Sequence, residues 1–388
     1  MRTMTDLKQM QSLPLEAKVA MSRVRIKGWI NEFGEDGVYM SFSGGKDSTV
    51  LLDLIRNQCG YRDIPAVFVD VPTQYPELKQ FATSFDDVEV LKPKISFMEV
   101  CERYGFPLIS KEVSSVVFGA RQYLRKLESL DDGESADNIP YHDWYNRLTG
   151  QGNYAKQDLN KLAEHLSTNM GNGGSNYRTA LLLGLISKDG QIKIPENSND
   201  RSNFSQEKYK FFLEAPFEIS DRCCNVMKKK PVHDYSKKTG RMPMTAQMAE
   251  ESALRQQAWL KNGCNGFNMK APISNPMSFW TEQDVLQYIK DNNLPICSVY
   301  GDVVEDDNRL FLPTPTDKPH LKTTGCKRTG CMLCGFGCHL EKSPNRFEML
   351  KETHPKMYGL LDVVTNNGVT FREAIEWTNE HGNLNIRL

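Results

Sequence analysis

The chain has 388 residues, 39% of them hydrophobic and 25% charged, with a net charge of −1 at pH 7. This length predicts two domains, or one α/β domain with large additions. The near-neutral charge gives no global electrostatic argument for binding to nucleic acid or to a membrane surface. No window approaches the ~18 consecutive apolar residues of a membrane helix, and the first residues lack a signal-peptide pattern. We therefore expect a cytoplasmic protein without a membrane partner.

The first hundred residues alternate between helical and strand patterns. Helices are expected over residues 15–33, 49–55, 77–84 and 97–104, and strands over 38–43, 66–71 and 88–91. The second strand is a continuous apolar run, which is typical of a strand buried on both faces of a sheet. Strands that alternate with helices predict an α/β fold with a doubly wound parallel sheet.

The rest of the chain is less regular. Residues 128–176 have a loop-like, apolar-poor composition, which predicts an insertion or lid. Further helices are expected over residues 181–186, 278–289, 347–358 and 371–379. Beyond Val303 the chain is loop-rich through a group of cysteines.

A glycine loop follows the first expected strand, with the sequence Ser43-Gly44-Gly45-Lys46-Asp47-Ser48. Two glycines let the backbone turn sharply and approach an oxygen-rich ligand. The helix that follows points unpaired N–H groups and its positive dipole end at that ligand. Lys46 adds positive charge, and Asp47 is suited to hold Mg²⁺ or to orient the loop. The loop therefore predicts a nucleotide phosphate site, and the alternative is a tight strand–helix turn without a ligand.

The loop differs from both common phosphate-binding patterns, G-x-x-x-x-G-K-[ST] and G-x-G-x-x-G. It resembles the SGGxDS loop of the ATP pyrophosphatase superfamily, and within it the phosphoadenosine phosphosulfate (PAPS) reductase-like family. Further similar segments are Val67–Asp70, Gln74–Glu77, Gly105–Glu112, Thr239–Pro243, Ala249–Arg255 and Pro276–Val285. The resemblance extends from about residue 30 to residue 345, outside the expected insertion.

The resemblance implies an adenine nucleotide alpha hydrolase-like fold with the nucleotide at the carboxyl ends of the parallel strands. Phosphates would be surrounded by Ser43, Gly44, Gly45, Lys46, Asp47 and Ser48, and the adenosine would lie near Asp70. Lys111, Arg241 and Arg255 are candidates to bind a sulfate, phosphate or pyrophosphate group. The catalytic candidates are Lys46, Asp47 and Arg255.

The expected organisation has five consecutive regions. They are an N-terminal helical segment (1–33), a nucleotide-binding α/β core (34–127), the insertion (128–176), the rest of the PAPS reductase-like core (177–300) and a cysteine-bearing, helical C-terminal region (301–388).

Six of the ten cysteines are clustered: Cys223, Cys224, Cys326, Cys331, Cys334 and Cys338. In a reducing compartment such thiols favour a metal site over disulfides. The adjacent pair disfavours a zinc ribbon, which normally has two C-x₂-C pairs. The adjacent pair with a distant C-x-x-C is similar to the site of adenylylsulfate (APS) reductases, which implies a [4Fe–4S] cluster on Cys223, Cys224, Cys331 and Cys334.

A second ligand set remains open, because Cys326, Cys331 and Cys334 have the spacing of plant-type ferredoxins and Cys338 follows them. Buried thiols without a metal are a third interpretation. Cys331 and Cys334 belong to both ligand sets.

The C-terminal part departs from the reductase pattern. APS and PAPS reductases carry a nucleophilic cysteine in a Glu-Cys-Gly-x-His context, whereas the last cysteine here is Cys338. Sulfite release by the familiar route is therefore not expected. Cys326 or Cys338 could replace that nucleophile if its pKa were lowered by neighbours such as Lys327, Arg328 or His339.

Three functions follow from these patterns. The first is an enzyme that binds ATP or a sulfonucleotide, with Mg²⁺, and acts in sulfur transfer or in pyrophosphate or sulfate cleavage. Its partner would be a nucleic acid acceptor, met by the basic runs Lys228–Lys230 and Lys237–Lys238, or a redox or sulfur-donor protein. The second is a sulfonucleotide reductase with a relocated cysteine. The third is a nucleotide-sensing module without catalysis. The oligomeric state is not predicted.

Overall fold

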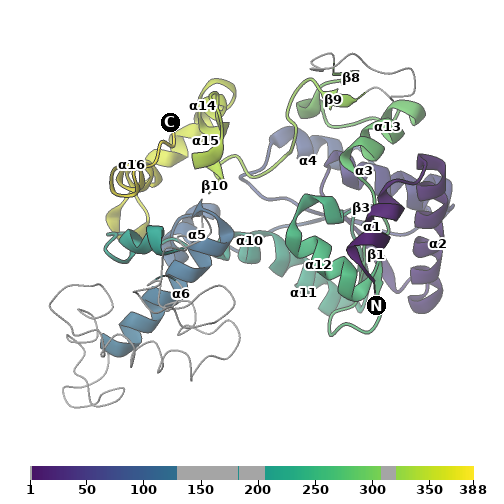
Figure 1. The fold of residues 1–388 in the computed structure, drawn as a ribbon, viewed down its shortest axis with the longest axis horizontal. Coiled ribbons are helices and arrows are strands. Elements are labelled where there is room, and N and C mark those ends of the chain that lie inside the picture. The colour runs from purple at the N-terminus through teal and green to yellow at the C-terminus, as the bar shows by residue number, and fades with distance from the viewer. Residues whose placement is uncertain (1, 129–181, 183–205, 307–319) are drawn as a thin grey trace. The chain divides into compact units, whose positions relative to one another are not determined.

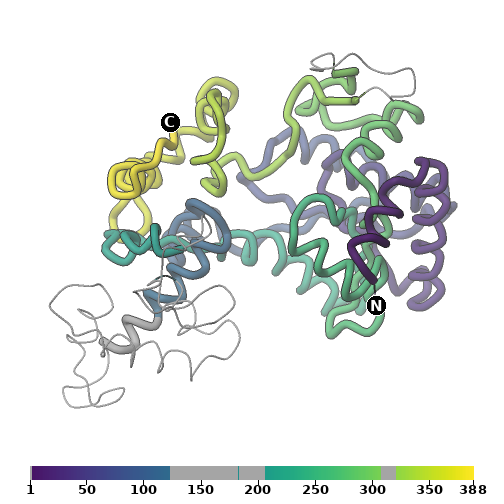
Figure 2. Tube along the Cα trace, in the orientation of Figure 1, coloured from purple at the N-terminus to yellow at the C-terminus, as the bar shows by residue number. Residues whose placement is uncertain are grey.

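A computed structural model of the chain describes residues 2–128, 182, 206–306 and 320–388. The chain forms two compact units (Figures 1 and 2). Unit 1 consists of Met1–Lys94 and Val226–Cys331, and unit 2 of Ile95–Asn225 and Met332–Leu388. Each unit thus combines two separate stretches of the chain, and the five consecutive regions stay a prediction. Beyond Glu128, the expected insertion lies outside the described residues.

Unit 1 contains a six-stranded sheet of the order β3-β2-β1-β5-β7-β6. The strands are β1 (Val38–Phe42), β2 (Ala66–Val69), β3 (Val88–Leu91), β5 (Met242–Met244), β6 (Asn265–Gly266) and β7 (Ile273–Ser274). Five of them run parallel, and β6 is antiparallel to β7. The mostly parallel sheet confirms the predicted α/β fold.

The strand order places a ligand site. From β1 the chain moves outward to β2 and β3, and it later returns to the other side of β1 as β5. Met40 is accordingly paired with Ala66 on one side and with Met244 on the other. Ligands of open α/β sheets bind outside the carboxyl ends of the strands where the order reverses in this way. The carboxyl ends of β1 and β5 therefore form the expected site.

Helices cover the sheet of unit 1 (Figure 1). They are α1 (Met4–Gln11), α2 (Leu15–Phe33), α3 (Lys46–Asp53), η1 (Leu54–Gln58), α4 (Pro76–Ala82), η5 (Asn225–Lys229), α11 (Lys230–Thr239), η6 (Ala249–Glu251), α12 (Ala253–Asn262), α13 (Glu282–Asn292) and η7 (Ser298–Tyr300). A hairpin of β8 (Val303–Glu305) and β9 (Leu321–Thr323) follows. The predicted helix over 15–33 is confirmed as α2, because its buried face of Ile26, Trp29 and Ile30 joins the core of this unit.

Unit 2 is mainly helical around a two-stranded parallel pair, β4 and β10. Its elements are α5 (Phe97–Tyr104), β4 (Leu108–Ile109), α6 (Lys111–Glu128), η4 (Glu207–Leu213), α10 (Arg222–Cys224), β10 (Gly335–Phe336), η8 (Cys338–Leu340), α14 (Arg346–Thr353), α15 (Pro355–Tyr358), η9 (Gly359–Asp362), η10 (Asn366–Gly368) and α16 (Phe371–Gly382). Aromatic rings form its core, with Phe106 stacked on Phe371 at 4.9 Å between ring centroids and Phe347 edge-on to the latter.

A half-buried arginine organises the polar backbone of unit 2. Arg121 donates to the carbonyls of Phe212, Ala215 and Phe217 at 3.1, 2.9 and 2.7 Å. Its Nε also lies 3.1 Å from the carboxylate of Glu218. Because Phe212 lies in the last turn of η4 and Ala215 and Phe217 lie in the irregular segment after it, one guanidinium supplies hydrogen bonds that regular secondary structure would otherwise provide.

No helix within the described residues is both long and apolar enough to cross a membrane.

Candidate functional site: the glycine loop of unit 1

The loop after β1 turns at a glycine that no other residue could replace without strain. Gly44 has φ +71°, and a Cβ atom there would lie 2.9 Å from the Leu78 carbonyl oxygen. The chain then enters α3 at Lys46, with Gly45 as the residue before the helix. The predicted strand–loop–helix unit is confirmed, although the helix begins three residues before the predicted position 49. The first N–H groups of α3 consequently face the carboxyl edge of the sheet.

Two serines hold the loop in this shape. The Ser43 and Ser48 hydroxyl oxygens lie 3.0 Å apart, and Ser48 Oγ also donates to the Gly45 carbonyl at 2.8 Å. The Gly45 N–H donates to Ser43 Oγ at 3.3 Å. The two serines thus bond to the loop itself, and their predicted contact with a ligand remains a prediction.

A cavity of about 420 Å³ lies over this loop. Its lining comes entirely from unit 1: Ser43, Gly45, Lys46, Asp47, Met248, Glu250, Glu251, Glu282, Tyr300, Lys327, Arg328 and Thr329. The first four follow β1, and Met248 to Glu251 follow β5, so the cavity lies at the reversal of strand order. Its position agrees with the expected site of an α/β sheet.

Lys46 is the cation at the floor of this cavity, with a side chain only 5% exposed. Its Nζ donates to the Lys327 carbonyl at 3.2 Å and lies 3.3 Å from a carboxylate oxygen of Glu282. Its backbone N–H donates to the Tyr300 hydroxyl at 3.3 Å. Lys46 therefore presents two donors at one point, a charged ammonium and the first N–H of α3, which is an arrangement suited to phosphate oxygens.

Asp47 is the acidic group beside it. Burial raises the pKa of this carboxyl, while the neighbouring Lys46 ammonium lowers the pKa and the Glu282 carboxylate raises it further. Its Oδ1 makes no hydrogen bond within the described residues, although Lys46 Nζ lies 3.7 Å away. A buried carboxylate oxygen without a hydrogen bond is chemically suited to hold Mg²⁺, as the sequence led us to expect.

Arg255 reaches the same charge cluster. It lies in the first turn of α12, forms an ion pair with Glu251 of the cavity lining, and interacts electrostatically with Asp47 and Arg328. Burial lowers the pKa of its guanidinium. The structure therefore brings together Lys46, Asp47 and Arg255, the three catalytic candidates.

Three other predicted ligands are not among the residues that line the cavity. Asp70 follows β2 and is paired with Lys79 at 2.7 Å. Arg241 precedes β5, at the amino edge of the sheet, and donates to the Tyr235 hydroxyl at 2.9 Å. Lys111 is exposed at the start of α6 in unit 2, whereas the cavity belongs to unit 1. Their roles in nucleotide binding remain predictions.

The far wall of the cavity could not be found from the sequence. Tyr300 and Lys327 lie 254 and 281 positions along the chain from Lys46, and Glu282 comes from the first turn of α13. No spacing pattern links such distant residues. The one hint in the sequence is the pair of adjacent cations, Lys327 and Arg328, directly after Cys326.

The clustered cysteines are divided between the units. Cys326 and Cys331 belong to unit 1, and Cys223, Cys224, Cys334 and Cys338 belong to unit 2. None of these six forms a disulfide in the part of the chain that the structure describes. Among the described residues, no three or more His, Cys, Asp or Glu side chains are arranged to hold a metal ion. Both candidate ligand sets span the two units, so the structure tests neither.

Cys338 is poorly suited to be a nucleophile. Its side chain is buried, and burial raises the pKa of its thiol to about 12. We therefore expect Cys338 to react with iodoacetamide at pH 8 at least ~100-fold more slowly than an ordinary thiol, because only about one molecule in 10⁴ carries the thiolate. Peptide mass spectrometry of the folded protein against the same protein in guanidinium measures this ratio, and equal rates would contradict the assignment.

Comparisons with known proteins concern the family of the chain and not its individual site residues. The model of the phosphoadenosine phosphosulfate reductase domain family matches residues 37–132 and 186–335. The chain is similar to a crystal structure of phosphoadenylyl-sulfate (PAPS) reductase from Candida auris in a phosphate complex, with 12% sequence identity and a TM-score of 0.34. That match covers 77% of this chain and 91% of the other. A search of curated proteins finds no match.

Proposed function

Because the chain belongs to the phosphoadenosine phosphosulfate reductase domain family, we propose that it is an enzyme that binds ATP or a sulfonucleotide over the glycine loop of unit 1. The observation that carries this proposal is the position of Lys46. A buried ammonium and the first N–H of α3 converge at the floor of a cavity at the strand-order reversal. This arrangement is suited to a polyphosphate, since it offers a full charge and a helix dipole to the same oxygens.

The acids of the cavity favour a magnesium-bound nucleotide. Asp47, Glu250, Glu251 and Glu282 line it together with three cations, Lys46, Lys327 and Arg328. Four carboxylates oppose the approach of an uncomplexed polyanion, and a divalent cation offsets part of the negative charge. This charge balance supports ATP with Mg²⁺ ahead of a sulfonucleotide, with Asp47 as the residue that would contact the metal.

The chemistry that this site supports best is cleavage at the α-phosphorus of ATP. An acceptor oxygen attacks the α-phosphorus, the bond to the bridging oxygen breaks, and pyrophosphate leaves with that electron pair. Lys46, the N-terminus of α3 and Arg255 would stabilise the charge that develops on the leaving pyrophosphate. Sulfur transfer then follows if a sulfur nucleophile displaces AMP from the adenylated acceptor.

We also propose the [4Fe–4S] cluster on Cys223, Cys224, Cys331 and Cys334, whose donor chemistry suits iron because thiolates are the usual ligands of such clusters. Such a cluster would supply electrons or support sulfur chemistry, and the steps above do not depend on it. About four irons per chain after anaerobic purification, lost in a Cys223→Ser variant and retained in a Cys326→Ser variant, would support this set. A colourless protein with zinc would contradict it.

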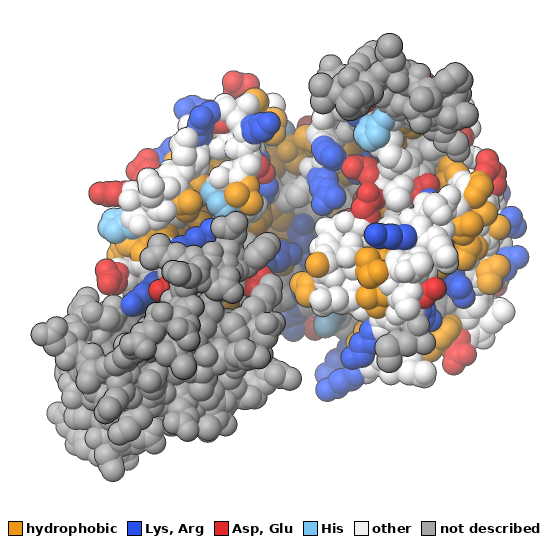
Figure 3. All heavy atoms as spheres, in the orientation of Figure 1, with side chains coloured by type: hydrophobic (Ala, Val, Ile, Leu, Met, Phe, Trp, Pro, Cys, Tyr) orange, Lys and Arg blue, Asp and Glu red, His pale blue; other side chains and the backbone are white. Residues whose placement is uncertain are grey.

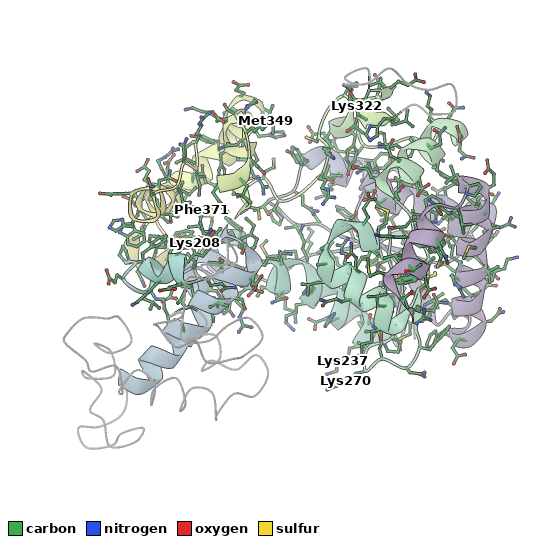
Figure 4. The ribbon with its side chains drawn as sticks, viewed as in Figure 1. Lys208, Lys237, Lys270, Lys322, Met349 and Phe371 are labelled. Carbon is green, nitrogen blue, oxygen red and sulfur yellow. The ribbon has the colours of Figure 1, made fainter. Side chains whose placement is uncertain are left out.

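A nucleic acid is the proposed acceptor, because basic side chains gather on α11. Lys230, Lys237 and Lys238 are exposed, and among the described residues only the first is offset by an ion pair, with Asp234 at 3.1 Å. Figure 4 labels Lys237 at the bottom of unit 1 in this view, at the opposite end from Lys322 of β9. Figure 3 shows Lys and Arg side chains at the same bottom end. An exposed lysine cluster of this kind contacts phosphate backbones without sequence preference.

A product analysis tests the proposed function. The purified protein is incubated with Mg²⁺ and either ATP or adenylyl sulfate, with and without tRNA or DNA, and pyrophosphate, AMP and sulfite are measured. Release of pyrophosphate and AMP from ATP supports the proposal. Absence of every product from both nucleotides would contradict an enzymatic role.

Sulfonucleotide reduction is the second candidate, and one observation favours it. Cys326 lies in the same unit as the loop, directly before the cavity-lining Lys327–Thr329, and its thiol is partly exposed with Sγ 3.7 Å from the Tyr75 hydroxyl. Sulfite release from adenylyl sulfate that disappears in a Cys326→Ser variant would establish this route. Undiminished release in that variant would exclude Cys326 as the nucleophile.

A further inference from the structure

The phosphate donors of the loop are already occupied by groups of the protein itself. The Tyr300 hydroxyl accepts the Lys46 N–H at 3.3 Å, and the Lys327 carbonyl accepts the Lys46 ammonium at 3.2 Å. Tyr300 is only 2% exposed, and a Cβ atom built on Gly45 would lie 3.2 Å from its hydroxyl. Two protein oxygens thus accept from the donors that the proposed function assigns to phosphate oxygens.

Both oxygens are connected to the cysteine-bearing segment that runs from Cys326 to Cys331. The Tyr300 hydroxyl lies 2.8 Å from Thr329 Oγ1. Because it already accepts from Lys46, its own hydrogen is free to be donated to Thr329. The second oxygen is the backbone carbonyl of Lys327, which is itself in this segment.

Backbone hydrogen bonds join the start of this segment to η7. The Cys326 N–H donates to the Val299 carbonyl at 2.8 Å, and the Gly325 N–H donates to the Tyr300 carbonyl at 2.8 Å. A Cβ atom on Gly325 would lie 2.4 Å from the Val299 carbonyl oxygen, so this close approach depends on glycine. η7 and the start of the segment therefore hold the Tyr300 ring and Thr329 within reach of each other.

We propose that the Tyr300 hydroxyl and the Lys327 carbonyl are place-holders for phosphate oxygens, and that the Cys326–Cys331 segment holds the loop in a state that a nucleotide must displace. The inference rests on the proposed nucleotide site and adds a regulation to it. A nucleotide takes over the Lys46 N–H and ammonium, and Thr329 and the Lys327 carbonyl lose their partners. By linkage, a change that stabilises this arrangement of the segment weakens nucleotide binding, and the factor by which it raises the Kd equals the factor by which nucleotide binding disfavours the arrangement.

The place-holders predict that two substitutions in the cavity wall strengthen binding. Tyr300→Phe keeps the ring over Lys46 and removes only the competing oxygen, so the ligand-free state loses a hydrogen bond that the bound state does not have. The Kd for ATP with Mg²⁺ should fall by about two- to tenfold, the value of one hydrogen bond. Thr329 is a positioning residue that acts through Tyr300. Thr329→Val should therefore also lower the Kd, but by a smaller factor than Tyr300→Phe.

Isothermal titration calorimetry with ATP and Mg²⁺ measures these changes on the full chain. Tyr288→Phe is the matched control, since it removes another buried phenol hydroxyl in unit 1, which is hydrogen-bonded to Asp53 and lies outside the cavity lining. Thr329→Ser keeps the hydroxyl and should retain the wild-type Kd. In the double variant, Thr329→Val should add nothing to Tyr300→Phe, because both interrupt one path.

Tighter binding in Tyr300→Phe and Thr329→Val, with both controls unchanged, supports the place-holders. Equal or weaker binding in Tyr300→Phe overturns them and leaves the nucleotide site in place. Binding of ATP by the wild-type protein without turnover rejects the proposed reaction but not this inference. If neither the wild-type protein nor Tyr300→Phe binds ATP, the inference falls together with the nucleotide site.

Discussion

Replacement of Lys46 by alanine is expected to lower nucleotide turnover by about 10²- to 10³-fold, the usual effect of removing one donor from a preorganised anion site. The physical reason is that this ammonium is buried at the cavity floor beside the first N–H of α3, so its loss leaves the phosphate without its charged donor there. Glu282 keeps a second cation, because Lys327 Nζ lies 3.6 Å from its other carboxylate oxygen. The substitution should therefore affect turnover far more than stability.

The measurement is the rate of pyrophosphate release from ATP, together with a thermal unfolding curve for each variant. Lys290→Ala is the matched control, since this lysine is 43% exposed on α13 and is paired with Glu305 outside the cavity lining. We expect wild-type turnover in the control. A Lys46→Ala protein that is folded and retains more than about a tenth of the wild-type rate would contradict the assigned role.

Replacement of Arg121 by leucine is expected to destabilise unit 2 by about 3–5 kcal/mol, the range for removing one partner of a buried ion pair. The side chains of Arg121 and Glu218 are 15% and 7% exposed, so water cannot fully replace the lost partner. Three backbone carbonyls at the end of η4 and in the segment after it also lose their Arg121 donor. The free energy of unfolding should fall accordingly.

Urea unfolding followed by circular dichroism measures this change, with the two units fitted as separate transitions where two are resolved. Arg103→Leu serves as the control, because this arginine is 55% exposed in the same unit and forms only a surface ion pair with Glu99 at 3.7 Å. Its expected effect is below about 0.5 kcal/mol. A loss of less than about 1 kcal/mol in Arg121→Leu would show that the guanidinium does not organise this segment.

The parts of the fold that were predictable are those encoded in adjacent residues. The predicted strand at 88–91 and the helices at 15–33 and 97–104 appear as β3, α2 and α5 with the same bounds. The glycine loop was equally readable, since one short stretch contains the turn glycine, the cation and the helix start. Local periodicity and turn chemistry are sufficient for such elements.

Short strands escaped detection because tertiary pairing, not their own pattern, defines them. β5 has three residues with Pro243 in the middle, and β7 has two, yet both complete the parallel sheet beside β1. Proline is depleted in strands, so the sequence of β5 does not predict a strand there. The expected loop-rich region after Val303 likewise contains the two short strands of the β8–β9 hairpin, as well as β10.

Only the part of the candidate site that is contiguous in sequence was predictable. The floor of the cavity follows β1 in sequence, whereas Glu282, Tyr300 and Lys327 reach it only through the fold. Arg255 was proposed through a family resemblance and does reach the charge cluster. Arg241 was proposed in the same way, but it precedes β5 and so lies at the opposite edge of the sheet. Which end of a strand a residue occupies depends on strand direction, which spacing alone does not reveal.

A crystal structure of the chain with ATP and Mg²⁺ tests the central claim most directly. We predict that phosphate oxygens contact the Lys46 N–H and Nζ at hydrogen-bond distance, with the metal at Asp47 and the Tyr300 hydroxyl displaced from the loop. ATP bound away from Ser43–Ser48, with the Lys46–Tyr300 hydrogen bond intact, would contradict the assignment of this loop as the nucleotide site.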